Sequence, residues 1–65
     1  MTRDRKARQG QSTMHNAITH IEHQAKELEG VAVWAQERQD FGEAENVRYA
    51  IGKLNDAAEA LRLCI

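Results

Sequence analysis

Apolar residues recur along the N-terminal half of the chain at alternating steps of four and three positions. The series runs through Met14, Ile18, Ile21, Ala25, Leu28, Ala32 and Ala35. An apolar residue at every third or fourth position forms one stripe along a helix, and the strict alternation is typical of helices that pack in pairs. Ser12 or Thr13 suits the helix start, because its hydroxyl can accept a hydrogen bond from a free backbone amide. We therefore predict a first helix over about residues 13–39.

A second series of the same kind occupies the C-terminal half. It runs through Ala44, Val47, Ile51, Leu54, Ala58, Leu61 and Ile65. Between the two series, Gly42 can take the left-handed conformation that ends a helix, and Asp40 with Glu43 forms the capping box of a helix start. We predict a turn at about residues 40–42 and a second helix over about residues 43–63.

The two helices are expected to form an antiparallel hairpin over residues 12–65, because a short turn joins them. The sequence has no proline and no run of alternating polar and apolar residues, so the predicted fold class is all-α. The predicted core seam consists of Met14, Ile18, Ile21, Leu28, Val47, Ile51, Leu54 and Leu61. Two helices leave both flanks of such a seam in water, so we expect a second copy that completes a homodimeric four-helix bundle.

Charge is distributed unevenly along the chain, although the formal net charge is only −1. Residues 1–11 lack apolar residues spaced for packing, so we predict that they form a disordered basic arm. The basic residues of this arm are Arg3, Arg5, Lys6 and Arg8. Such an arm can contact the phosphates of a nucleic acid, or it can be a solvated terminus that improves solubility. The body is acidic and has no basic stripe, which favours the solvated terminus.

Several large apolar residues fall outside the seam. Four of them form a candidate contact for the dimer or for a partner protein: Val31, Trp34, Phe41 and Tyr49. Buried aromatic residues anchor protein interfaces more often than other residues do, which supports this interpretation, although a large aromatic residue near a turn more often covers the end of the hairpin. The alternative is that the aromatic residues near the turn fold over the end of the hairpin and cover its core.

The sequence offers little for metal binding or catalysis. His20, His23 and Glu27 are spaced to share one helical face, but that face is opposite the seam and no further ligand is evident. A single cysteine, Cys64, cannot form an internal disulfide and has no evident base or shaped pocket beside it. We expect no enzymatic activity, no metal and no cofactor. The lone thiol, together with the absence of a signal peptide or long apolar run, favours a cytoplasmic protein without membrane contact.

In length and layout, the chain resembles the plasmid RNA-binding hairpin Rop, which dimerises into a four-helix bundle. The basic, RNA-facing side chains of that hairpin have no clear counterparts on the first helix here, so the resemblance implies architecture and not RNA binding. The stretch ENVRYAIGKLNDAAEALR, residues 45–62, is similar to small helical accessory proteins of temperate lambdoid phages. That resemblance implies a dispensable modulator of a host protein or of the lysis and lysogeny decision.

Taken with the patterning, these observations favour a non-enzymatic protein-interaction module, a homodimeric hairpin that engages a host or phage protein. The alternative is a nucleic-acid-associated regulator that contacts phosphate through the basic arm. A third hypothesis is that the acidic surface mimics nucleic acid and blocks a DNA-binding protein.

Overall fold

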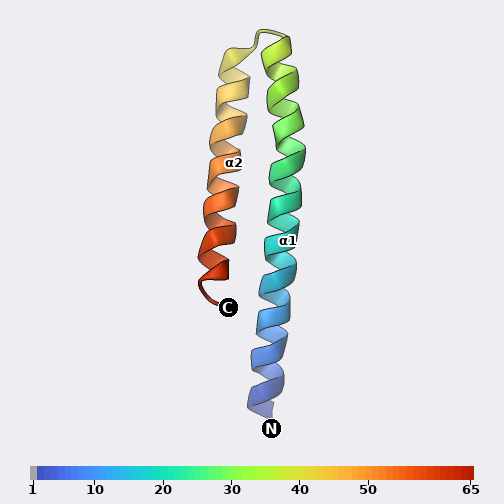
Figure 1. The fold of residues 1–65 in the computed structure, drawn as a ribbon, viewed down its shortest axis with the longest axis vertical. Helices are drawn as coiled ribbons and strands as arrows, with labels where there is room; N and C mark the ends of the chain where they lie inside the picture. The colour runs from blue at the N-terminus through green and yellow to red at the C-terminus, as the bar shows by residue number, and fades with distance from the viewer. Residues whose placement is uncertain (1) are drawn as a thin grey trace.

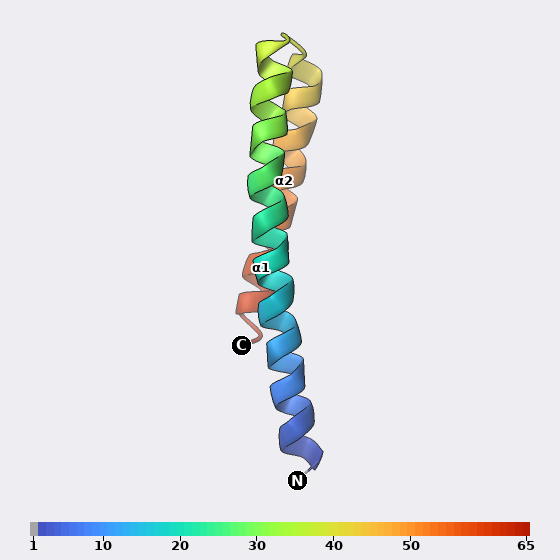
Figure 2. The same ribbon diagram turned by 90° about the vertical axis from the view of Figure 1, so that its right-hand side faces the viewer.

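The computed structural model is a hairpin of two helices and describes the backbone of residues 2–65 and the side chains of residues 10–65 (Figure 1). Helix α1 spans Thr2–Glu37 and helix α2 spans Phe41–Arg62. The two helices pack against each other, and residues 2–65 contain no strand. In the second view α2 crosses α1 at a shallow angle, as in coiled-coil packing (Figure 2). The predicted all-α hairpin is confirmed.

Helix α1 begins much earlier than the sequence analysis predicts. A disordered arm over 1–11 and a helix start near residue 13 are expected, whereas the helical backbone begins at Thr2 and extends well beyond the end of α2 (Figure 1). The residues involved are mostly strong helix formers, so the helix continues past its last packed layer. Gly10 lies inside this helix, where glycine costs about 1 kcal/mol relative to alanine without ending the helix. The expected caps, Ser12 and Thr13, are therefore interior helical residues.

The candidate phosphate contacts belong to this early part of α1. They are Arg3, Arg5, Lys6 and Arg8, and their side chains lie outside the described residues. The contact that the sequence analysis assigns to them stays a prediction.

The turn is built around Gln39 and not around Gly42. Gln39 has a φ of 62°, and no glycine has a positive φ among the described residues. The amide of Gln39 donates to the carbonyl of Gln36 (2.9 Å) and that of Asp40 donates to the carbonyl of Ala35 (2.9 Å). This pair of hydrogen bonds is the Schellman motif, which satisfies the last carbonyl groups of α1. Helix α1 thus ends two residues earlier than predicted, and Gly42 lies in the first turn of α2.

Asp40 caps the start of α2, as the sequence predicts. Its side chain accepts a hydrogen bond from the backbone amide of Glu43 (Oδ1 to N, 3.2 Å), which satisfies one of the free donors of the first turn. The carboxylate of Glu43 does not complete a reciprocal capping box. It accepts a hydrogen bond from Arg38 instead (Nη2 to Oε2, 2.7 Å), and this contact joins the end of α1 to the start of α2.

The core is narrow and consists mainly of alanine. The buried side chains that the structure describes are Ile18, Ala25, Ala32, Ala35, Ala44, Ile51 and Ala58. The remaining seam residues within the helices are half-buried: Met14, Ile21, Leu28, Val47, Leu54 and Leu61. Ile65 is the last residue of the second apolar series, but it is 40% exposed because α2 ends at Arg62. Alanine at several layers allows the two backbones to approach closely, and the larger side chains lie beside that contact.

Candidate interaction surface

The two long sides of the hairpin differ in what covers the seam. On one side polar residues connect the helices: Arg62 Nη2 lies 2.8 Å from Glu22 Oε2, and Arg48 Nη2 donates to Gln36 Oε1 over 2.5 Å. Each of these four polar residues follows a buried residue by four positions, which is about one helical turn. Their side chains therefore pass over the buried part of the seam. Those buried residues are Ile18, Ala32, Ala44 and Ala58. We call this side, formed by Glu22, Gln36, Arg48 and Arg62, the bridged face.

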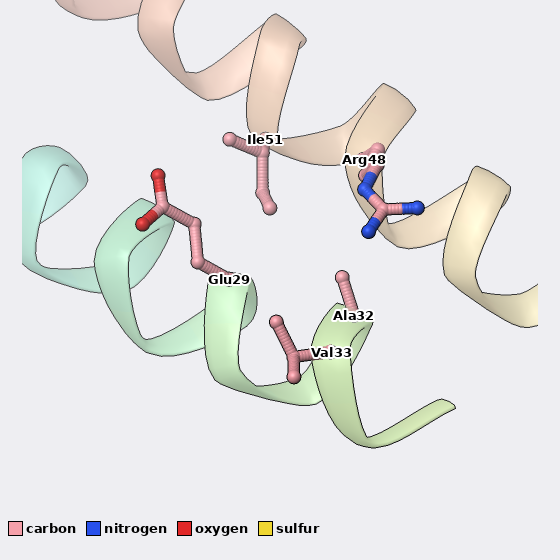
Figure 3. A pocket seen from close by; sticks show the side chains of 5 residues that line it. All are labelled: Glu29, Ala32, Val33, Arg48 and Ile51. Carbon is pink, nitrogen blue, oxygen red and sulfur yellow. The ribbon is translucent and has the colours of Figure 1, made fainter. Parts of the chain in front are cut away.

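A groove of about 360 Å³ lies on the bridged face between the two helices, lined by Glu29, Ala32, Val33, Arg48 and Ile51. Figure 3 shows Ala32 and Ile51 pointing into the space between the helices, with the charged ends of Glu29 and Arg48 at its edge. Ligand pockets usually enclose most of a small molecule, whereas this groove is bounded by two helices only. The groove marks the place where the small side chain of Ala32 leaves room in the interhelical contact, and its geometry does not favour a catalytic centre.

The opposite side of the hairpin carries the six half-buried seam residues. Each of them is flanked on the helix surface by the residue three positions later in the sequence. These flanking residues are Ala17, Gln24 and Val31 on α1, and Ala50, Ala57 and Cys64 on α2. Four of these six are alanine or valine, which leave the larger aliphatic side chains uncovered. We call this side, formed by the six half-buried residues and their six flanking residues, the open face.

An ion pair marks the turn end of the open face. Arg38 and Glu43 approach to 2.7 Å, and the guanidinium of Arg38 also lies over the ring of Trp34, 3.9 Å from its centroid. Trp34 lies three positions after Val31, on the outer edge of the open face, and remains 57% exposed. The turn end therefore combines an aromatic ring, a cation and a carboxylate in one cluster.

The structure does not gather the four predicted contact residues on one surface. Val31 (38% exposed) flanks the open face and Trp34 lies at its edge, whereas Tyr49 (68% exposed) is on the outer side of α2, with Lys53 Nζ 5.2 Å from its ring centroid. Phe41 begins α2 and is 62% exposed. The alternative that the aromatic residues cover the hairpin end is wrong, because both Trp34 and Phe41 are mainly in solvent.

The remaining sequence candidates are separate surface features. His23 Nε2 lies 3.1 Å from Glu27 Oε1 in an exposed pair, and residues 10–65 contain no group of three or more His, Cys, Asp or Glu arranged to hold a metal ion. Cys64 is exposed, and its thiol lies 3.5 Å from the carbonyl of Ala60. None of these residues belongs to the bridged face, whose paired side chains the sequence analysis did not identify. The signal was present, since Glu22 and Arg62 carry opposite charges at equivalent places beside the two stripes.

Comparison with protein families, curated proteins and solved structures gives no match to this chain. Among the residues that the structure describes, neither helix has the combination of length and apolar character needed to cross a membrane. The fold and its surface therefore define the chain as a two-helix antiparallel hairpin with one bridged face and one open face.

Proposed function

We propose that this chain is a non-enzymatic protein-interaction module that assembles as a homodimer through its open face, giving a four-helix bundle. The observation that carries the proposal is the row of six half-buried aliphatic residues along one side of the hairpin. Fully burying a side chain of this kind contributes about 1.5–3 kcal/mol, so half-burial leaves roughly half of that contribution unused at each position. A protein surface that covers the row recovers it.

The thin core supports the same conclusion. Isoleucine is the largest residue that the hairpin buries among its described side chains. Domains of this size usually require a disulfide, a metal, unusually good helix packing or a second chain, and the lone Cys64 is free. A second copy supplies the missing apolar contacts without a cofactor.

The exposed area supports a partner as well. The chain exposes 5353 Å², whereas a compact monomer of 7.4 kDa is expected to expose about 4,200 Å². The Cα positions extend over 57 × 15 × 10 Å, so the excess of about 1,100 Å² follows from a rod that is two helices wide and one helix thick. A standard interface buries about 800 Å² on each partner, which is within this excess.

In the proposed dimer, Trp34 and Tyr49 remain available to a different protein. Both rings are more than half exposed, and each has a basic side chain beside it: Arg38 beside Trp34 and Lys53 beside Tyr49. Exposed aromatic residues beside charged groups are frequent anchors of heterologous contacts. They support the further part of the proposal, that the dimer modulates a host protein as an accessory factor of a phage or mobile element.

Sedimentation equilibrium of three proteins tests the dimer. The wild type is expected to be dimeric at micromolar concentration. Ala57→Glu places a charge in the middle of the open face and is expected to weaken the dimer at least about 100-fold, because an unpaired charge would be buried there. Gly52→Glu adds the same charge to the same helix, at a position where a Cβ meets nothing within 4 Å, and is expected to remain dimeric.

Two results would contradict the proposal. The first is a wild type that stays at the mass of a single chain, 7.4 kDa, up to hundreds of micromolar with its helical circular dichroism intact. The second is an Ala57→Glu protein that dimerises as strongly as Gly52→Glu, which would place the contact elsewhere on the hairpin.

A further inference from the structure

The size of the side chains on the open face changes along the hairpin. Near the turn, the open face is formed by Val31, Val47 and Ala50. Toward the free end, the face contains Met14 and Leu61, which are larger. The hairpin therefore presents small side chains at its turn end and large ones at the other, so its apolar surface is tapered.

The two ends of the hairpin also differ in net charge. Residues 37–45, around the turn, hold four acidic residues and one basic residue, and residues 2–8, at the opposite end of α1, hold four basic residues and one acidic residue. The local charges are thus about −3 and +3. Figure 1 shows these two segments at opposite ends of the molecule. Two copies side by side with their turns together would bring like charges together at both ends, which is unfavourable.

We infer that a second copy of this chain covers the open face head to tail, with the turn of each hairpin beside the free ends of the other. This inference rests on the proposed dimer. In this orientation each small layer faces a large one, which fills an interior more evenly than small against small and large against large. The basic start of each α1 also runs past the acidic turn of the partner, so charge and shape favour the same orientation.

The two-fold axis of such a dimer crosses the open face near Leu28 and Leu54, which are half-buried. The ion pair of Glu22 with Arg62 reflects the register of the hairpin, and in this register the two leucines lie at nearly the same level. Leucine side chains of both copies therefore surround the axis and form the centre of the proposed interface.

The native Cys64 provides a direct measurement of orientation. It is the only cysteine in the sequence and is exposed, so a nitroxide spin label can be attached without any substitution. Head to tail, the two labels are separated along the bundle by about 19 residues of helix, or about 28 Å. With the turns together they lie at one level and are separated only by neighbouring helices, which are 8–10 Å apart, giving less than about 20 Å between labels.

A second label position keeps the test independent of Cys64, which flanks the open face. Gly42→Cys in a Cys64→Ser background puts the label at the outer side of the turn, where an added Cβ comes no closer than 4.0 Å to its neighbours. The expected axial separation there is about 37 Å, from 25 residues of helix. Sedimentation of each labelled protein first confirms that it is dimeric at the concentration used.

Pulsed electron paramagnetic resonance distances of about 28 Å or more at Cys64, with a longer distance at Gly42→Cys, support the head-to-tail arrangement. Distances below about 20 Å at Cys64 in a dimeric sample would overturn it and leave the dimer itself intact. Absence of any dipolar coupling from a monomeric wild type would instead contradict both the orientation and the proposed function. The two failures are therefore distinguishable.

Discussion

Replacing Leu54 with alanine separates the stability of the hairpin from the stability of the dimer. Leu54 is half-buried within one chain and lies in the middle of the open face. Removing a fully buried leucine side chain costs about 2–5 kcal/mol, and roughly half of this is lost where burial is half complete. The lone hairpin should lose about 1–2.5 kcal/mol, and the dimer a further 1–2.5 kcal/mol in each chain. Because 1.4 kcal/mol is a factor of ten, the dissociation constant should rise at least about 30-fold.

Ile51→Ala is the matched control for this substitution. Ile51 is only 9% exposed in a single hairpin, so its truncation destabilises the monomer and the dimer to a similar degree. Sedimentation equilibrium gives the dissociation constants, and urea unfolding at 5 and at 100 µM protein gives the concentration dependence of stability. The reasoning would be refuted if Leu54→Ala weakened association no more than Ile51→Ala does.

Three further substitutions or deletions test separate parts of the structure. Gln39→Gly should raise the free energy of unfolding by about 0.5–1 kcal/mol, because glycine adopts the positive φ found there without steric cost; thermal unfolding by circular dichroism measures it, and a loss of stability would contradict the assigned turn. Asp40→Ala should lower stability by about 0.5–2 kcal/mol through loss of the cap on the Glu43 amide, and the same measurement applies. Deletion of residues 1–9 should weaken the dimer at low ionic strength and leave it unchanged at 0.5 M salt, where charges are screened. Nucleic-acid binding that collapses with salt and disappears on this deletion would favour the regulator hypothesis instead.

The features that depend on local spacing are predictable from the sequence. The alternating steps of three and four define both apolar stripes, and residues within the helices that belong to them are buried or half-buried. Asp40 is identifiable as a cap because its side chain acts on an amide only three residues away. These features involve neighbours along the chain, so no knowledge of the other helix is needed.

The positions at which helix α1 begins and ends are less predictable, because helical and non-helical backbone have similar free energies there. The start of α1 has no apolar partner layer, so its sequence predicts a disordered arm, whereas the structure shows helical backbone from Thr2. A glycine is normally favoured at a left-handed position, and yet Gln39 occupies it, because the two hydrogen bonds of the Schellman motif fix the helix end there.

The division into a bridged and an open face requires knowledge of how the two helices are aligned. Glu22 and Arg62 are far apart in the sequence, and only the register of the hairpin brings them to 2.8 Å. The same alignment separates Tyr49 and Phe41 from the edge of the open face, where Trp34 lies. Side chains on a helix surface are exposed at most positions, so apolar character alone did not indicate which of them share a surface.

The contact among Trp34, Arg38 and Glu43 has a consequence for any protein that recognises the indole ring. Arg38 lies 3.9 Å from the ring centroid and is itself held by Glu43 at the start of the other helix, so the ring is supported from the turn before a partner arrives. A side chain that is already ordered loses less rotational freedom on binding, and this raises affinity without adding contact area. The turn thus preorganises an aromatic anchor, and its sequence bears on recognition as well as on chain reversal.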